Sequence, residues 1–168
     1  MTDETLNFQN KGVPKERWLP DKLWHEVLMT MPIACVDVIF QREDKSILYG
    51  WRLIRPYANV WALLGGRILR GEDLYHCAAR IAKEYRLRFE ELYLNGVFPV
   101  RFTSRSDIVV SLAARKLSGK PRVDGVEFSK FVWTRVPPKR LGTNYVRMVT
   151  HWKRASRSVS FRQLSLLP

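Results

Sequence analysis

The 168-residue chain has few of the side chains that build disulfide networks or zinc sites. Its two cysteines, Cys35 and Cys77, are far apart and lie within apolar patterns, so we predict that both are small buried hydrophobic residues. The three histidines are scattered, and no Cys/His cluster has the spacing of a zinc site. The sequence therefore predicts neither a disulfide-stabilised fold nor a zinc-stabilised one.

Long apolar runs are also absent. No stretch approaches the roughly 18 consecutive apolar residues that a membrane span needs. Residues 1–5 are polar and acidic, unlike a secretory signal peptide. With 46% hydrophobic and 27% charged residues in the length of one ordinary domain, the sequence predicts a soluble cytoplasmic protein with no membrane partner.

Acidic residues are scarce, because 16 Asp and Glu face 29 Lys and Arg, and the formal net charge is +13. From Lys139 to the end there is no Asp or Glu. This positive charge attracts polyanions, so nucleic acid is a candidate partner of the basic C-terminal segment. That hypothesis predicts salt-sensitive RNA binding that is lost on truncation after about Pro138. The alternative is an amphipathic end helix that packs on the domain or on a second subunit, with an apolar face of Tyr145, Met148, Val149 and Trp152.

The first half of the chain alternates between helical and extended patterns. We predict a helix over residues 21 to about 29, with Asp21 as its N-cap. Residues 33–40 are nearly all apolar and predict a buried strand, and after a polar turn the chain returns as a second strand over residues 46–53. These two strands are predicted to form a hairpin. A short apolar strand at residues 60–64 ends at a Gly-Gly pair.

The second half continues the mixed pattern. Leu74, Ala78, Ile81 and Tyr85 form one apolar stripe and predict a helix over residues 72 to about 87. Two or three further strands are expected around residues 97–102, 107–116 and 126–136, with a turn at 118–121 between the last two. The whole is a mixed α+β sandwich in one domain over residues 19–156, between a disordered N-terminus at residues 1–18 and a basic C-terminal tail at residues 157–168.

One glycine and two charged residues in the middle of the chain have a diagnostic spacing. Gly66 is followed six residues later by Glu72, and Arg80 comes eight residues after that. This arrangement, after an apolar strand, resembles the Nudix box. The resemblance implies a Nudix-type α/β/α sandwich with a mixed β-sheet. It also implies a structural ion pair between Glu72 and Arg80 that holds the loop against the helix.

Residues 19–133 resemble the GDP-mannose mannosyl hydrolase branch of the Nudix superfamily. The matching pieces are a Gly-x-Arg-x-x-Arg-Pro run at residues 50–56, Trp61, and a Gly-Gly-Arg run at residues 65–67. The resemblance implies that Arg52, Arg67 and Arg80 contact or lie beside the diphosphate of a nucleoside diphosphate ligand, and that Asp37 lies near the nucleotide. Homodimers are common in this branch, so we expect one here. Trp24 and Trp152 suit either its interface or the core.

The arginine assignment has a physical basis besides the resemblance. A diphosphate carries two or more negative charges, and guanidinium groups hold its oxygens by charge-assisted and often bidentate hydrogen bonds. The same groups stabilise charge that develops on a leaving nucleoside diphosphate. For Arg52 and Arg67 we therefore favour ligand binding, whereas Arg55 and Arg70 are interpreted as solvated surface residues.

The box departs from the usual pattern at the positions that bind metal. Nudix boxes carry three glutamates there, and this chain has Ile81, Glu84 and Tyr85. The glycine that usually closes the box is Leu87. In the mannosyl hydrolases a Gln-His pair supplies a metal ligand and the general base, and the alignment anchored on Trp133 puts Glu127 and Phe128 there. Phe128 cannot accept a proton.

Two functional hypotheses follow. In the first, the backbone of Gly66 and the carboxylates of Glu84 and Glu127 share Mg²⁺ or Mn²⁺, and a nucleotide sugar such as GDP-mannose is hydrolysed. Glu84, Arg80 and Arg67 are then the catalytic residues, and Glu84, Glu127 or Asp107 would be the base. In the second, the protein is catalytically inactive and binds a nucleotide, a nucleotide sugar or a nucleic acid. The loop at residues 103–105 has no pattern that identifies the base or sugar.

Overall fold

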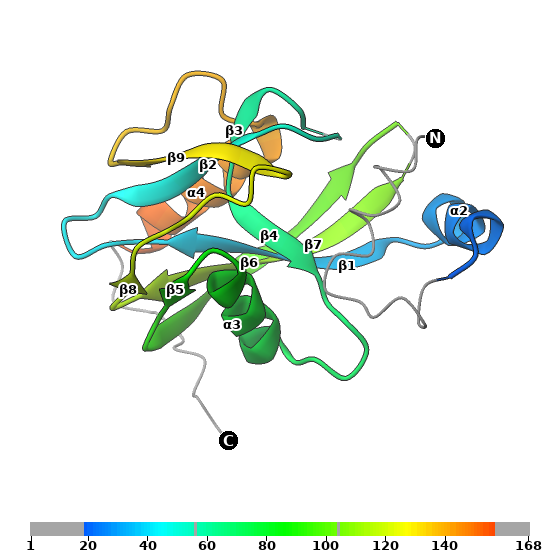
Figure 1. Ribbon diagram of the computed structural model, residues 1–168, viewed down its shortest axis with the longest axis horizontal. Helices are drawn as coiled ribbons and strands as arrows, with labels where there is room; N and C mark the ends of the chain where they lie inside the picture. The colour runs from blue at the N-terminus through cyan, green and yellow to red at the C-terminus, as the bar shows by residue number, and fades with distance from the viewer. Residues whose placement is uncertain (1–18, 56, 104, 157–168) are drawn as a thin grey trace.

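The computed structural model describes residues 19–55, 57–103 and 105–156. The predictions for residues 1–18 and 157–168 lie outside these described residues. These described residues form two β-sheets, a short two-stranded ribbon and three helices, whose arrangement Figure 1 shows. The described helices include none that is long and apolar enough to span a membrane.

The larger sheet has the strand order β4-β1-β7-β6 and is mixed. Its central strand β1 (Ile33–Phe40) pairs antiparallel with β4 (Leu64–Arg67) and parallel with β7 (Ser106–Arg115). Strand β6 (Glu91–Arg101) pairs antiparallel with β7 and forms an edge. Because β1 has protein on both faces, Val36, Val38, Ile39 and Phe40 are fully buried, as its nearly continuous apolar sequence predicts.

The smaller sheet has β2 (Ile47–Arg52) at its centre, between β3 (Val60–Ala62) and β9 (Phe128–Thr134). A separate ribbon joins β5 (Leu87–Arg88) to β8 (Ser118–Gly119), so the turn predicted at residues 118–121 begins within a strand. The predicted hairpin of residues 33–53 is wrong, because β1 and β2 belong to different sheets and share only an isolated bridge between Gln41 and Ile47. The backbone of β1 is already paired on both sides by β4 and β7.

The single strand predicted at residues 60–64 is two strands. Strand β3 ends at Ala62 and β4 begins at Leu64, so the chain leaves one sheet and enters the other around the buried Leu63. This crossing brings Arg52 at the end of β2 and Arg67 at the end of β4 into one region of the molecule.

Helix α2 (Asp21–Thr30) forms where the apolar spacing predicts it, with Trp24 and Leu28 buried. The predicted cap is wrong, because Pro20 is the N-cap and no side chain caps the helix. Asp21 lies in the first turn instead, where a negative charge is favourable near the positive end of the helix dipole.

Helix α3 (Leu74–Glu84) is shorter than the predicted 72–87. It begins after Asp73, whose side chain accepts a hydrogen bond of 2.7 Å from the backbone N–H of His76. Glu72 lies before the helix and binds Arg80 instead. The apolar stripe is confirmed, since Ala78, Ile81 and Tyr85 are fully buried.

Helix α4 (Thr143–Ala155) covers the face of the larger sheet opposite to α3 and packs on β6. Its apolar residues are buried, and the indole N–H of Trp152 donates to Gln41 Oε1 at 3.2 Å. The alternative that the basic end helix packs on the domain is therefore confirmed. Trp24 and Trp152 are both core residues, and the homodimer stays a prediction.

Gly50 generates a stability prediction, because it is buried directly beneath the ring of Phe128. A Cβ at this position would overlap that ring, so Gly50→Ala should force β2 and β9 apart and lower the free energy of unfolding by about 1–3 kcal/mol. Urea unfolding measures the change. The control is Gly66→Ala, another strand glycine, where the nearest heavy atom to a Cβ is 3.7 Å away. Equal effects of the two substitutions would contradict the packing argument.

Candidate active site

A cleft of about 1040 Å³ gathers the residues that the sequence singled out for ligand, metal and catalysis. Helix α2, strands β1 and β4, helix α3 and the start of α4 contribute to its lining. The sequence-predicted residues on its walls are Asp37, Arg52, Gly66, Arg67, Arg80, Glu84 and Glu127. Glu72 supports this cleft through Arg80 rather than lining it.

Arg80 joins the loop after β4 to α3. Its Nε lies 2.7 Å from Glu72 Oε1, and its Nη2 donates to Glu72 Oε2 at 3.0 Å and to the carbonyl oxygen of Arg67 at 2.8 Å. Glu72 Oε2 also accepts from the backbone N–H of Leu69 at 3.0 Å. The hydrogen bonds from Arg80 lower the pKa of Glu72, so the pair stays charged at neutral pH. This arrangement fixes the loop relative to the helix.

Arg67 lines the cleft with one guanidinium nitrogen left without a hydrogen-bond partner among the described residues. This nitrogen, Nη2, is buried, and the guanidinium lies 4.7 Å from the ring centroid of Trp24. Burial lowers the pKa of Arg67, and the like charges of Arg105 and Arg80 lower it further. A buried donor without a partner is costly, so an anion bound at this point would be stabilised.

Arg52 and Glu127 form a buried ion pair at the other side of the cleft. The pairing of β2 with β9 brings them together, and Arg52 Nη2 lies 3.3 Å from Glu127 Oε1. The second carboxylate oxygen of Glu127 accepts a hydrogen bond of 2.9 Å from the hydroxyl of Tyr85. Arg52 Nη1 also donates to the hydroxyl of Tyr145 at 3.3 Å. Glu127 therefore has protein partners on both oxygens.

Asp37 lies on β1 in the floor of the cleft. Burial raises its pKa to about 7, and the positive charge of Arg52 opposes that shift, whereas Asp107 and Glu127 add to it. A Cβ at Gly65 would overlap the Asp37 carboxylate, so the first glycine of the Gly-Gly pair makes room for this side chain. Asp37 is therefore a cleft carboxyl group that changes its charge near neutral pH.

The proposed metal donors do not form a metal site by themselves. Among the residues that the structure describes, no three His, Cys, Asp or Glu side chains are grouped so as to hold a metal ion. Glu84 lies 3.1 Å from Arg80 Nη1, and Glu127 is paired with Arg52, so each carboxylate already has a cationic partner. Gly66, Glu84 and Glu127 line the same cleft, but this donor set does not fit a cation held by the protein alone.

The two aromatic departures from the family pattern pack against each other. The sequence resemblance predicts a metal ligand at the position of Tyr85 and the base at that of Phe128, and the ring centroids of these two residues are 5.6 Å apart. Phe131 packs on both rings, and Ile81, Tyr85 and Phe128 are fully buried. The side of the site that would carry metal and base is therefore an apolar cluster.

Arg105 and Asp107 belong to the cleft although their sequence context has no motif. Arg105 Nη2 lies 2.9 Å from Asp107 Oδ2, while Arg105 Nε and Asp107 Oδ1 are buried without partners among the described residues. The sequence suggests Asp107 only as a base, and Arg105 follows a loop without a recognisable pattern. Arg55, interpreted as a surface residue, is exposed and also lines the cleft.

Aromatic side chains also line the cleft beside Arg52. The ring of Tyr57 lies 5.4 Å from that of Phe102 and 5.6 Å from that of Tyr145, measured between centroids. Such rings can stack on a planar base. Tyr57 directly follows the Arg-Pro motif, whereas Phe102 and Tyr145 have no sequence signal beyond their aromatic type.

The raised pKa of Asp37 predicts a pH-dependent stability. The folded protein holds this proton more tightly than the unfolded chain does, so the contribution to stability is present below about pH 4 and is lost as pH rises through about 7. Asp37→Asn removes that loss, so its free energy of unfolding should exceed that of the wild type by more at pH 8 than at pH 5. Urea unfolding at both values measures the difference. A difference independent of pH would show that Asp37 ionises normally in the folded protein.

Comparison with known proteins identifies the family. The NUDIX domain family matches residues 31–151. The low-salt glycan biosynthesis protein Agl8 of Haloferax volcanii is 29% identical over 66 residues, which are 39% of this chain and 42% of the relative. The chain thus matches less than half the length of that protein.

Solved structures of low sequence identity share the fold. The MutT NUDIX hydrolase of Burkholderia pseudomallei has a TM-score of 0.65 at 21% identity and covers 71% of this chain and 97% of that one. The NUDIX domain of Shewanella oneidensis NrtR, crystallised with ADP-ribose, has a TM-score of 0.64 at 15% identity and covers 93% and 99%. The mixed-sheet α+β sandwich and the family match agree, and the chain belongs to the NUDIX domain family.

Proposed function

We propose that the cleft binds a nucleoside diphosphate derivative, in the first place a nucleotide sugar such as GDP-mannose, and hydrolyses it. The observation that carries the proposal is Arg67, whose buried Nη2 lacks a partner among the described residues and whose charge is crowded by Arg80 and Arg105. A diphosphate oxygen at this point supplies both the missing acceptor and the missing negative charge.

The size and charge of the cleft support this ligand class. A cleft of about 1040 Å³ is ample for a nucleotide sugar. Its arginines outnumber its carboxyl groups six to four, and Asp37 is partly protonated near neutral pH. Arginine charge therefore balances the diphosphate. The aromatic group around Tyr57 offers a face for the base.

The chemical steps proposed here use the side chains of this chain alone. Water attacks the sugar carbon or a phosphorus atom, and the bond from that atom to the leaving oxygen breaks. Arg67 and Arg80 hold the diphosphate and stabilise the negative charge that develops on it. Among the cleft carboxyl groups, Asp37 has a pKa of about 7, which suits a group that accepts a proton from water at neutral pH. Nudix hydrolases generally use divalent metals.

Two relatives suggest which ligands to test. The Haloferax volcanii relative is described as a glycan biosynthesis protein, which supports nucleotide sugars as the first substrates to try. The Shewanella oneidensis domain was crystallised with ADP-ribose, which makes that dinucleotide-like diphosphate the second.

Binding without cleavage is the second candidate function. The observation that favours it is the packed pair of Tyr85 and Phe128, together with the engagement of Glu84 and Glu127 by arginines. Loss of a general base alone lowers a rate by roughly 10²–10⁴-fold. In this case the arginines hold a nucleotide, a nucleotide sugar or a nucleic acid without cleaving it.

A turnover assay separates the two functions. The purified full chain is incubated with GDP-mannose, other nucleoside diphosphate sugars and ADP-ribose, with Mg²⁺, with Mn²⁺ or with EDTA, and products are resolved by chromatography. We expect product in at least one reaction, and Arg67→Ala should lower kcat/KM by roughly 10²–10³-fold because a stabilising charge is removed. The control Arg147→Ala changes an exposed arginine of α4 outside the cleft and should leave the rate unchanged.

The products and the failures have distinct meanings. Free sugar with nucleoside diphosphate indicates hydrolysis between the sugar and the diphosphate, and nucleoside monophosphate indicates cleavage within the diphosphate. Ligand binding that depends on Arg67, without any turnover, would refute the hydrolase function and support binding without cleavage. Absence of both binding and turnover would refute the ligand class.

Glu84 provides a second, independent test. The substitution Glu84→Gln keeps a hydrogen-bond acceptor for Arg80 and removes the negative charge. In a hydrolase that depends on this carboxylate, turnover should fall by at least about 100-fold while calorimetry finds ligand binding within a few-fold. Unchanged turnover would remove Glu84 from the catalytic residues.

A further inference from the structure

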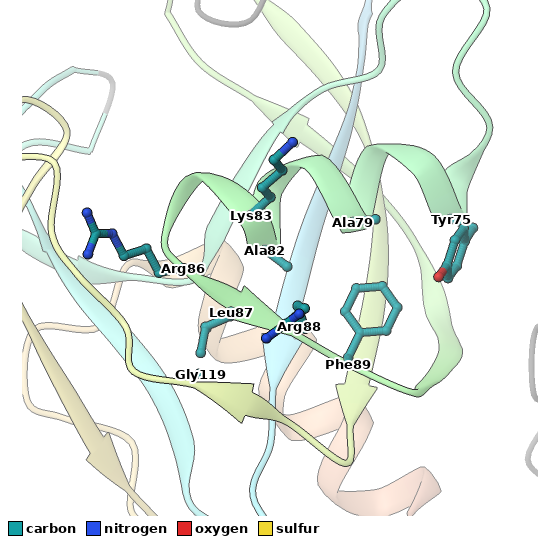
Figure 2. Close-up of a pocket in the computed structure, with 9 residues that line it drawn as sticks. All are labelled: Tyr75, Ala79, Ala82, Lys83, Arg86, Leu87, Arg88, Phe89 and Gly119. Carbon is teal, nitrogen blue, oxygen red and sulfur yellow. The ribbon is translucent and has the colours of Figure 1, made fainter.

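A second hollow lies on the side of α3 away from the cleft. It encloses about 600 Å³ between α3, the ribbon of β5 and β8, and Phe89. Its lining residues, shown in Figure 2, are Tyr75, Ala79, Ala82, Lys83, Arg86, Leu87, Arg88, Phe89 and Gly119. None of them lines the cleft, so the two sites share α3 but no side chain.

One end of this outer pocket is aromatic. The rings of Tyr75 and Phe89 lie together in Figure 2, with centroids 5.6 Å apart and planes at 80°. Between this end and the ribbon the hollow is lined by apolar side chains, namely Ala79 and the buried Ala82 and Leu87. A planar ring can pack on such aromatic faces with little rearrangement.

The rim of the outer pocket is basic and lacks compensating acid. Lys83, Arg86 and Arg88 are exposed, and no salt bridge is found for them within the described part of the chain. The lining contains no Asp or Glu. The contrast with Arg80 is direct, because that arginine is held by Glu72 and Glu84 on the same helix. An anion bound here would meet basic side chains without a competing carboxylate in the lining.

Arg86 follows Tyr85, the C-cap of α3. Its φ of 59° is a left-handed conformation that glycine or asparagine adopts more easily. An arginine at such a position carries strain that a smaller residue would avoid. In Figure 2 its side chain extends from the end of the helix away from the aromatic pair, and Arg88 lies between Arg86 and that pair.

We propose that the outer pocket binds a mononucleotide, with the base against Tyr75 and Phe89 and the phosphate on Arg86 and Arg88. The volume is that of a small-molecule site, and a base with one phosphate group combines the flat apolar part and the negative charge that the two ends require. This site is separate from the cleft, and the inference does not depend on hydrolysis there.

The test uses a chain in which the cleft is weakened. In the Arg67→Ala background, GMP and AMP are titrated by calorimetry at fixed salt, and we expect saturable binding of at least one of them. Adding Arg86→Ala and Arg88→Ala should raise Kd by roughly tenfold or more, because two charge-assisted contacts are lost. Adding Arg147→Ala instead removes the same type of charge elsewhere and should leave Kd within about twofold.

The aromatic end is tested with a conservative change. Phe89→Leu keeps an apolar side chain, and it should weaken the nucleotide while leaving the affinity for inorganic phosphate unchanged. A thermal melt verifies that each variant is folded. Three results would overturn the proposal: mononucleotide binding that is insensitive to Arg86→Ala and Arg88→Ala, inorganic phosphate binding as tightly as GMP, or a single-stranded oligonucleotide binding where mononucleotides do not.

Discussion

The site depends on the interaction of one arginine with the loop in front of its own helix. Arg80 binds both oxygens of Glu72 and the carbonyl oxygen of Arg67, and Glu72 also binds the backbone at Leu69. These charge-assisted bonds are partly buried and so are little weakened by solvent. They fix the backbone that carries Gly66 and Arg67 and thereby set the geometry of the cleft. The same arrangement places the positive charge of Arg80 near Arg67, which lowers the pKa of Arg67.

The departures from the family pattern are mutually consistent. Here Ile81, Tyr85 and Phe128 pack in one core, and the remaining carboxylates, Glu84 and Glu127, are each bound by an arginine. The positive charge that balances these two carboxylates therefore comes from arginine side chains.

Helix α3 presents different chemistry to its two sides. Arg80 and Glu84 face the cleft, while Ala79, Ala82 and Lys83 border the outer pocket. Ala78 and Ile81 between them are buried and anchor the helix to the sheet. The 3.6-residue period of the helix separates these roles, because neighbouring positions in the sequence point in directions about 100° apart.

Features that rest on local spacing were predictable from the sequence. The existence of β1, β2, α3 and α4 follows from apolar periodicity, and the spacing of Gly66, Glu72 and Arg80 indicates a loop joined to a helix. Tertiary contacts decided the rest. The sheets of β1 and β2 depend on which strands pair with their edges, and Arg105 enters the cleft only because β6 and β7 pair around its loop. The burial of Phe128 depends on Gly50 in another strand. The indole of Trp152 is buried and bonded to Gln41, a residue far away in the sequence. The sequence by itself determined which segments are helical or extended, since that preference lies within a few neighbouring residues. Only the tertiary structure decided which charges lack a partner, because this depends on residues far apart in the chain.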